Sequence, residues 1–269
     1  MKIVTLKGGL GNQLFGLAFA HSISVLTGED VGIYISGYPE PVFRREFELG
    51  QLVDRIEGVS AVHRPFAVGK TARSLLKRLP AAGYYFEPRK PPSMRELEGA
   101  VRRARRFEGY WQNEAYIVAP DDYRRLVRAF VASNAAVFAA DPFDVIIHYR
   151  TYQDQRIASR AKTPNADYFS RAFKYVTDRL GASVRVGLIS DDPTFAMNAI
   201  GEMADFAVPV LATEALTDMS LIFSARALLL SNSSFSWWGG YCSDASVVTY
   251  PTQDGYYHYP SPAARFTLV

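Results

Sequence analysis

Cysteine is nearly absent from this sequence of 269 residues, in which Cys242 stands alone. A single cysteine excludes an internal disulfide and any zinc cluster built on cysteine ligands, so we expect Cys242 to be a small core residue. Long apolar runs are missing too, because none reaches the roughly 18–20 residues that span a bilayer. Residues 1–6 also lack the apolar core and cleavage site of a signal peptide. We therefore expect a cytoplasmic protein.

The sequence has no strong charge of one sign. It carries 30 Lys and Arg against 27 Asp and Glu, a net charge of +3, which is ordinary for a globular chain. One dense basic cluster does occur, at Arg102, Arg103, Arg105 and Arg106. Such a cluster is typical of a solvated helix face; the alternative is contact with an anionic membrane or a phosphate-bearing acceptor. No basic–aromatic motif points to nucleic acid.

Strands and helices alternate along most of the chain. Residues 2–6, 13–26 and 31–35 read as a strand, a helix and a strand, which opens an α/β domain. The segment 37–100 is irregular apart from helices near 71–78 and 93–105, and 121–132 also looks helical. Asp141 and Pro142 break the pattern, so we expect two domains, 1–140 and 141–269. In the second we expect strands at 145–148, 184–189, 207–210, 227–230 and 247–250, and helices at 166–180, 194–200, 216–224 and 235–243.

The first strand leads into a loop that is rich in glycine. It resembles the start of a dinucleotide fingerprint, but Leu14 stands where the third glycine belongs and no acid follows Ile35. An NAD site is therefore disfavoured. Glycines still let a ligand approach the backbone, and amide side chains suit a sugar or phosphate. The alternative is a simple strand–helix turn. The candidate donor-binding residues of this loop are Gly9, Gly11, Asn12 and Gln13.

Three strands of the second half end in polar residues. Because parallel strands present their carboxyl ends at one edge, these residues are expected to converge where ligands bind in such sheets. The three strand ends read His-Tyr-Arg (148–150), Ser-Asp-Asp (190–192) and Ser-Asn-Ser-Ser (231–234). The candidate donor-binding residues of this edge are His148, Arg150, Ser190, Asp191, Asp192, Asn232, Ser233, Ser234, Phe235 and Ser236.

The segment 231–240 is the most informative of the three. It follows an apolar strand and reads Ser-Asn-Ser-Ser-Phe-Ser-Trp-Trp-Gly-Gly. The backbone N–H groups of a helix start, together with the hydroxyls of Ser233, Ser234 and Ser236, can bind an anion. The adjacent Trp237 and Trp238 are expected to lock the turn into the core. The alternative is a serine cap on an ordinary helix.

The other two strand ends carry charge. Arg150 can clamp a diphosphate with paired hydrogen bonds, while His148 can orient the turn, donate to a ligand or be a buried core residue. Asp191 and Asp192 could bind a metal, cap the helix that starts at Pro193, or accept hydrogen bonds from guanine. We favour the cap and the base contact over the metal.

These motifs together resemble the family-11 glycosyltransferases, which are mostly α-1,2-fucosyltransferases. The resemblance runs nearly end to end, and its strongest match is the string Ser234-Phe235-Ser236-Trp237-Trp238-Gly239. The other matching segments are residues 8–15 (Gly-Gly-Leu-Gly-Asn-Gln-Leu-Phe), 109–114 (Gly-Tyr-Trp-Gln-Asn-Glu), 148–150 (His-x-Arg), 190–192 (Ser-Asp-Asp) and 218–220 (Asp-Met-Ser).

The resemblance implies a GT-B fold with two Rossmann-like domains and parallel sheets. It implies transfer of L-fucose from GDP-β-L-fucose with inversion, no metal and no cofactor. Arg150 would hold the β-phosphate, Asn12 would lie near the reacting centre, and residues 233–235 would bind phosphate. The N-terminal domain would receive an oligosaccharide or lipid-linked glycan acceptor near Tyr110, Trp111 and Gln112. A role in bacterial surface polysaccharide synthesis, with peripheral membrane contact, would fit.

One segment departs from the family. The family usually reads His-x-Arg-Arg-Gly-Asp-Tyr, whereas this chain has Thr151, Tyr152 and Gln153 after Arg150. Asp154 is then a weak candidate for the catalytic base, and the departing phosphate can accept the proton instead. Two rivals stay open: an inverting transferase with another donor or linkage, and a GDP-sugar-binding protein without turnover. The sequence does not fix the oligomeric state.

Overall fold

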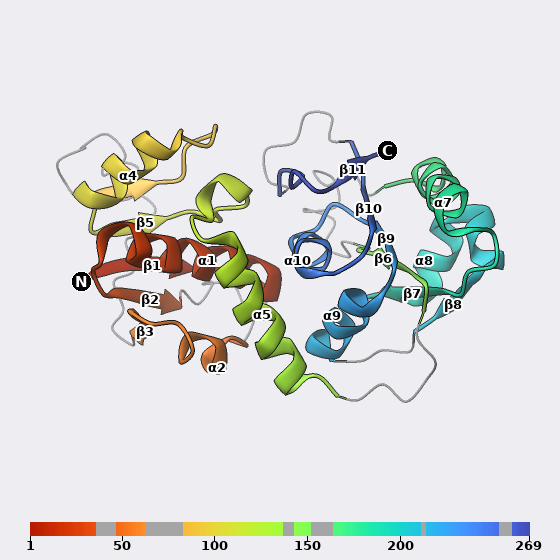
Figure 1. Ribbon diagram of the computed structural model, residues 1–269, viewed down its shortest axis with the longest axis horizontal. Coiled ribbons are helices and arrows are strands. Elements are labelled where there is room, and N and C mark those ends of the chain that lie inside the picture. Colours follow the sequence, from red (N-terminus) through yellow and green to blue (C-terminus); the bar gives the residue numbers. More distant parts are fainter. Residues whose placement is uncertain (36–46, 63–82, 137–142, 152–163, 211–213, 253–259) are drawn as a thin grey trace. The chain divides into compact units, whose positions relative to one another are not determined.

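A computed structural model describes residues 1–35, 47–62, 83–136, 143–151, 164–210, 214–252 and 260–269 (Figure 1). These residues form two compact units, 1–127 and 128–269, which are considered separately below. Three predictions lie outside the described residues: the domain boundary after 140, the helix near 71–78, and the candidate base Asp154.

The first unit is built on a five-stranded parallel sheet in the order β3-β2-β1-β5-β4. The predicted strand–helix–strand opening is confirmed, although its helix begins three residues earlier than expected, because Gly9 caps it. The elements are β1 (Lys2–Leu6), α1 (Leu10–Thr27), β2 (Val31–Ile35), α2 (Gly50–Val53), β3 (Val59–Val62), β4 (Tyr84–Phe86), α4 (Met94–Arg103), β5 (Arg106–Glu108) and a 3-10 turn at Glu114–Tyr116. Helix α5 (Pro120–Asn134) contains the boundary between the units.

The second unit holds a six-stranded parallel sheet in the order β11-β10-β9-β6-β7-β8. Counted from β6, this is the strand order of the Rossmann fold. The expected α/β class with two Rossmann-like parallel sheets is confirmed. The elements are β6 (Val145–Tyr149), α7 (Ala166–Leu180), β7 (Val186–Ser190), α8 (Pro193–Ala199), a 3-10 turn at Gly201–Asp205, β8 (Ala207–Pro209), α9 (Ala215–Ser224), β9 (Ala227–Leu230), α10 (Ser234–Cys242), β10 (Val247–Tyr250) and β11 (Thr267–Leu268).

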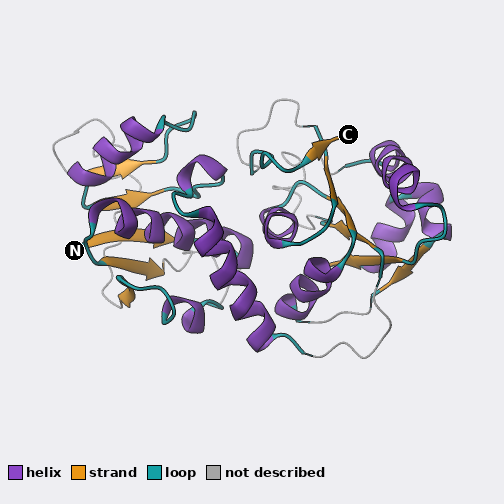
Figure 2. Ribbon diagram, in the orientation of Figure 1, coloured by secondary structure: helices purple, strands orange, loops and turns teal. Residues whose placement is uncertain are grey.

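Helices cover both faces of the second sheet, α7 and α8 on one face and α9 and α10 on the other (Figure 2). Side chains alternate along β6, so Val145, Ile147 and Tyr149 pack against α7 and α8 in one apolar cluster. The intervening His148 points to the opposite face, where its ring contacts α10. This alternation aims one polar side chain of a buried strand at the start of α10.

Helix α10 is anchored by its aromatic residues, as the sequence predicts. Trp237 and Trp238 are both fully buried, and the indole of Trp237 donates to the carbonyl of Ser261 at 2.7 Å. Cys242 is buried as well, which confirms its expected place in the core. On the sheet side, Gly240 leaves room for the packed side chain of Leu230. The start of α10 is therefore held firmly against the sheet.

The sequence did not predict β3, β4 and β5. Each has only three or four residues, which is too short for an alternating pattern to be recognised. They form strands by pairing: β3 pairs with β2, β5 pairs with β1, and β4 pairs with β5.

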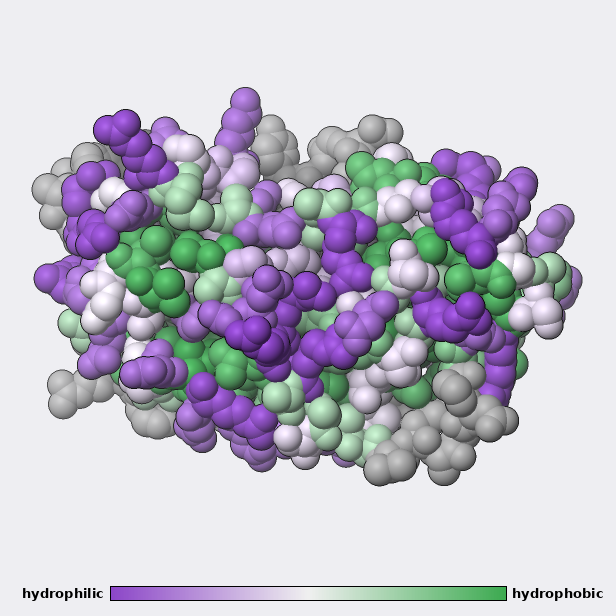
Figure 3. All heavy atoms as spheres, in the orientation of Figure 1, coloured by the Kyte–Doolittle hydropathy of each residue, from purple (hydrophilic) through white to green (hydrophobic). Residues whose placement is uncertain are grey.

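Within the described residues, no helix is long and apolar enough to cross a membrane. The face drawn in Figure 3 intersperses hydrophilic residues with smaller hydrophobic patches.

A glycine in α10 tests how closely this helix packs against the sheet, and a glycine in α4 serves as its control. In Gly240→Ala the new Cβ would lie 2.6 Å from Leu230 Cδ1 and 2.9 Å from Val248 Cγ1, both buried. We expect a net loss of about 1 kcal/mol or more, because overpacking outweighs the gain in helix propensity. Urea unfolding measures it. Gly99→Ala in α4 is the matched control, since its Cβ meets only the mobile end of Arg103 at 3.4 Å. It should stabilise by about 0.5–1 kcal/mol. An unchanged or raised stability of Gly240→Ala would contradict this packing.

Candidate functional site

In the first unit, the glycine loop between β1 and α1 is braced by Gln13. Its Nε2 donates to the Gly8 carbonyl at 3.0 Å, and its Oε1 accepts from the Glu48 N–H at 3.2 Å. Gln13 is 3 % exposed, and Gly8 has a positive φ of 80°. Both ends of the Gln13 amide are thus used inside the unit. We interpret Gln13 as a residue that shapes the loop, and its direct contact with the donor stays a prediction.

Asn12 meets a residue that lies one hundred positions away. Gln112 Nε2 donates to Asn12 Oδ1 at 2.6 Å, so the Asn12 oxygen is occupied and its amide nitrogen is the group left to donate. The structure therefore brings together two residues that the sequence assigned to donor and acceptor separately. Gly9 and Gly11 flank this position at the start of α1.

Trp111 is a core residue. Its side chain is 1 % exposed and its ring stacks on Phe19 at a centroid distance of 4.0 Å. Its backbone adopts a positive φ of 57°, which is uncommon for a bulky residue. The expected acceptor contact through Trp111 is corrected: burial leaves its ring no face for a sugar. Its neighbour Tyr110 is half-buried, and its N–H donates to Glu87 Oε2 at 2.7 Å.

A pair of charges at the ends of β1 and β5 escaped the sequence interpretation. Lys7 Nζ lies 2.7 Å from Glu108 Oε2, and Thr5 donates to Glu108 Oε1 at 2.8 Å. The two charged side chains are 14 % and 10 % exposed. The signal that could have found them is their position, because each directly precedes one of the glycine motifs.

The second unit brings all three predicted strand ends together at one edge. β6 pairs with β7 and β9, which sets Tyr149 opposite Ser190 and His148 opposite Leu230. The Arg150 N–H then donates to Ser231 Oγ at 3.1 Å. The expected convergence is therefore seen, and Ser231, one of the polar residues expected at this edge, joins two of the strand ends.

Arg150 is ion-paired in this structure. Its Nη1 lies 2.8 Å from Asp191 Oδ2, with the Arg150 side chain 36 % exposed. The other Asp191 oxygen accepts from the Thr151 N–H at 2.9 Å. Asp191 thus links the turn after β6 to the turn after β7. Because both of its oxygens are engaged with this turn, we interpret Asp191 as the residue that holds the guanidinium.

Asp192 caps α8. Its Oδ1 accepts from the Phe195 N–H at 2.9 Å, and Pro193 occupies the first helical turn, as the cap hypothesis predicts. Its own N–H donates to Ser190 Oγ at 3.1 Å. The Ser190 hydroxyl and one oxygen of Asp192 are therefore used locally.

Ser231, Ser233 and Ser236 form a hydroxyl cluster at the start of α10. Ser236 Oγ lies 3.0 Å from Ser231 Oγ, 2.7 Å from Ser233 Oγ and 2.5 Å from His148 Nδ1. Ser233 also caps the helix by accepting from the Ser236 N–H at 3.0 Å. The Ser233 and Ser236 hydroxyls thus have partners within the protein, and their expected contact with a phosphate stays a prediction.

Fewer groups at the start of α10 are open to a ligand than the sequence suggests. Ser234 and Phe235 are the first two residues of the helix, and within the described residues their N–H groups have no acceptor. Both residues are half-buried, whereas Asn232 before the cap is 4 % exposed. Two backbone N–H groups at a helix start suit an anion.

His148 is neutral at physiological pH. Burial and, to a smaller extent, the nearby Arg150 cation lower its pKa to about 4, while Asp191 opposes the shift. The side chain is 6 % exposed, and its ring lies 5.2 Å from that of Phe235. His148 therefore contributes hydrogen bonding without charge to the edge that carries Arg150.

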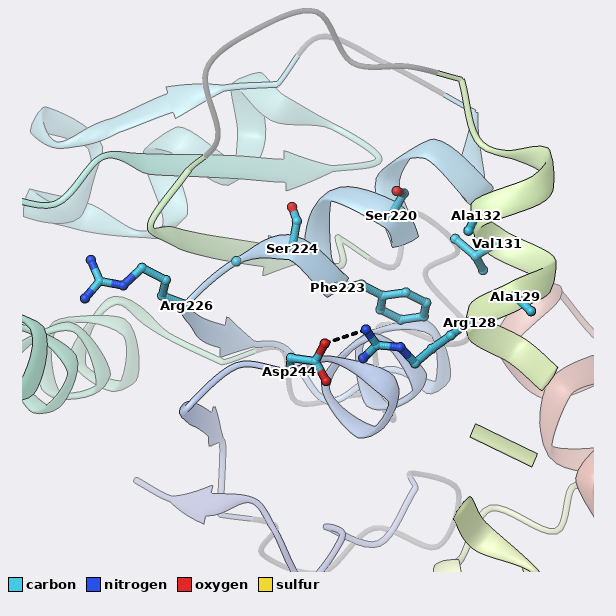
Figure 4. A pocket seen from close by; sticks show the side chains of 10 residues that line it. Arg128, Ala129, Val131, Ala132, Ser220, Phe223, Ser224, Arg226 and Asp244 are labelled. Atoms are coloured by element: carbon cyan, nitrogen blue, oxygen red, sulfur yellow. Dashed lines mark hydrogen bonds and ion pairs between the residues drawn. The ribbon is translucent and has the colours of Figure 1, made fainter. Parts of the chain in front are cut away.

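A separate pocket of about 680 Å³ lies elsewhere on the second unit (Figure 4). Its charges are paired: Arg128 with Asp244, and Arg226 with Asp144 at 3.0 Å. The Phe223 ring lies beside the Arg128–Asp244 pair. None of the predicted site residues lines this pocket.

Comparisons with known proteins support glycosyl transfer. No family model matches the chain. It is similar to an alpha-1,2-colitosyltransferase from Escherichia coli, at 25 % identity over 268 residues that cover 93 % of this chain and 91 % of the relative. This similarity relates the chain to a glycosyltransferase over almost its whole length.

Similar solved structures include two fucosyltransferases and a heptosyltransferase. NodZ alpha-1,6-fucosyltransferase soaked with GDP-fucose has 15 % identity and a TM-score of 0.49, with 90 % of this chain and 91 % of that chain covered. POFUT1 in complex with GDP has 12 % identity and a TM-score of 0.48, covering 93 % and 97 %. E. coli ADP-heptose lps heptosyltransferase II has 12 % identity and a TM-score of 0.46, covering 100 % and 90 %. At these scores the three structures carry no argument about activity.

The neutral His148 predicts a pH dependence of stability. Its folded pKa of about 4 lies below the ordinary 6.5, so the unfolded chain binds more protons between these values. The free energy of unfolding should therefore fall as the pH is lowered from about 6.5 towards 4. In His148→Asn that fall should be shallower, as urea unfolding at several pH values would show. His21 is present in both proteins, so its contribution cancels in the comparison. Equal slopes of the unfolding free energy against pH would contradict a buried, neutral His148.

Proposed function

We propose that this protein is an inverting, metal-independent fucosyltransferase of the GT-B type. It moves L-fucose from GDP-β-L-fucose to a glycan hydroxyl, with the 2-hydroxyl of a galactose-type residue as the expected acceptor. The observation that supports this most is the edge of the second sheet. There a guanidinium (Arg150), a neutral imidazole (His148) and the two N–H groups at the start of α10 gather at three strand ends.

This arrangement suits the chemistry of a leaving diphosphate. In the transfer, the bond between the sugar carbon and the β-phosphate oxygen breaks, and its electron pair stays on the phosphate. Positive charge develops on the sugar and negative charge on the diphosphate, so fixed cations and N–H donors lower the barrier. Arg150 supplies the charge, and the Ser234 and Phe235 N–H groups supply the oriented dipole of α10.

The acceptor hydroxyl attacks the face opposite the departing GDP, which inverts the sugar carbon. Its proton leaves either to Asp154 or to the departing phosphate. In the first unit, the Asn12 amide nitrogen offers a donor to a sugar oxygen, while Tyr110 and Gln112 are the proposed acceptor contacts.

A second donor has a specific observation behind it. The E. coli relative is an alpha-1,2-colitosyltransferase. Colitose is L-fucose without its 3-hydroxyl. GDP-linked colitose and GDP-fucose therefore share the same diphosphate and have nearly the same sugar ring. A GDP-linked colitose is therefore the alternative donor, and a GDP-sugar-binding protein without turnover is the remaining alternative.

Membrane contact is the weaker part of the proposal. Three of the four clustered arginines are engaged within the first unit: Arg102 with Glu98 at 2.8 Å, Arg105 with Glu29 at 2.9 Å, and Arg106 with the Tyr84 hydroxyl at 3.2 Å. Arg102 lies on α4, whereas Arg105 and Arg106 lie beyond its end, so the cluster is a set of paired side chains and not one helix face. We propose a cytoplasmic protein whose contact with a lipid-linked acceptor at the membrane is transient.

Donor choice is tested by thermal stabilisation. A ligand that binds only the folded protein raises Tm by mass action. We expect GDP and GDP-fucose to raise Tm equally with and without EDTA, and UDP-sugars and NAD to have no effect. GDP-colitose in the same series ranks the second donor. A shift with UDP-sugars alone, or one abolished by EDTA, would overturn the proposed donor or the absence of a metal.

Arg150→Ala should abolish turnover while leaving the fold intact. We expect transfer to fall by about 10²–10³-fold or below detection, because the diphosphate loses its cation. Donor hydrolysis and transfer assays measure this effect, and Tm and circular dichroism check the fold.

Arg226→Ala is the matched control for that variant. Arg226 pairs with Asp144 at 3.0 Å much as Arg150 pairs with Asp191 at 2.8 Å, but at the opposite end of the strands. It should retain activity. An active Arg150→Ala protein would remove Arg150 from the mechanism.

A further inference from the structure

The hydroxyl cluster at the start of α10 determines which nitrogen of His148 carries its proton. Ser236 Oγ touches three groups, at 2.5 Å (His148 Nδ1), 2.7 Å (Ser233 Oγ) and 3.0 Å (Ser231 Oγ). A hydroxyl has one hydrogen and two acceptor positions. The Ser236 hydrogen can therefore satisfy only one neighbour, and the other two must donate to it.

Ser231 must be one of the donors. Its oxygen accepts from the Arg150 N–H at 3.1 Å, and the residue is fully buried. Within the described residues, Ser236 Oγ is the one acceptor that its own hydrogen can reach. A buried hydroxyl that failed to donate would be left unsatisfied, which would destabilise the folded protein.

Ser233 is the other donor by the same reasoning. Its oxygen accepts the capping hydrogen bond from the Ser236 N–H at 3.0 Å, and its hydroxyl is 2.7 Å from Ser236 Oγ. With both acceptor positions of Ser236 filled, its hydrogen has His148 Nδ1 as its remaining partner. His148 Nδ1 is thus an acceptor, and the proton of the neutral ring is on Nε2.

We infer that Ser231, Ser233 and Ser236 fix His148 as a neutral Nε2–H donor, and that this donor binds a phosphate oxygen of a nucleoside diphosphate. The inference rests on the proposed function for its ligand but not for its tautomer. Within the described residues Nε2 has no hydrogen-bond partner, and Arg150 and the start of α10 border the same ring. Ser236 is then a positioning residue, since it acts on the ligand only through His148.

Nitrogen-15 NMR of the imidazole rings in the whole, ligand-free protein tests the tautomer directly. The two ring nitrogens have different shifts when only one is protonated, and the His148→Asn spectrum identifies the His148 signals. We expect Nε2–H at pH 7. In Ser236→Ala the Nδ1 signal should move and the Nδ1–H form should become populated. A wild-type His148 protonated on Nδ1 would overturn the inference.

Binding of GDP tests the consequence. We expect Ser236→Ala to weaken GDP binding by about tenfold, as measured by calorimetry. Ser243→Ala is the matched control: Ser243 is equally buried at the other end of α10 and donates to the Gly240 carbonyl at 3.0 Å. It should change binding by less than about twofold.

Comparison of the two variants with the wild type separates a failure of this inference from a failure of the proposed function. Equal weakening in both variants would overturn the positioning role of Ser236. A wild-type protein that has the Nε2–H tautomer but binds no GDP would overturn the proposed function while leaving the tautomer in place.

Discussion

The short contact between His148 and Ser236 is the interaction on which the second unit's site depends. At a distance of 2.5 Å it joins the end of strand β6 to the first turn of helix α10, and the two residues are separated by 88 positions in the chain. Its strength comes from burial, because no water competes for either group and a break would leave both unsatisfied. This contact joins the strand end that carries Arg150 to the helix start, which the buried Trp237 and Trp238 also anchor.

The charged side chain of Arg150 is oriented by contacts within the protein itself. Asp191 holds the guanidinium through one oxygen and the Thr151 N–H through the other. A half-exposed pair of this kind has modest strength, so a diphosphate can share or replace the carboxylate without a large penalty. What the pair supplies is orientation: it limits the rotamers of a long side chain before the ligand arrives.

The sequence predicts the second unit well because its central strands are mainly apolar runs that are buried on both faces of the sheet. Helix 166–180 and the strands 227–230 and 247–250 have their predicted bounds, and the convergence at the strand ends follows from parallel pairing alone. Predictions fail where a role depends on which atom faces which. Ser233 and Ser236 are the right residues, but their hydroxyls point inward; Trp111 lies in a motif, but its ring is in the core. Contacts such as Gln112 with Asn12, or Lys7 with Glu108, join distant segments, so no local pattern contains them.

Thr151, where the chain departs from the family that it resembles, has an electrostatic consequence at the edge of the second sheet. Thr151 stands where the family that the chain resembles usually has a second arginine. Among the described residues at this edge of the sheet, Arg150 is the one cation, and Asp191 offsets it. Stabilisation of a leaving diphosphate must then rely more on uncharged donors. The N–H groups of Ser234 and Phe235 and a neutral imidazole are of this kind, and they act at full strength only if their direction is fixed in advance. The serine cluster is what fixes it.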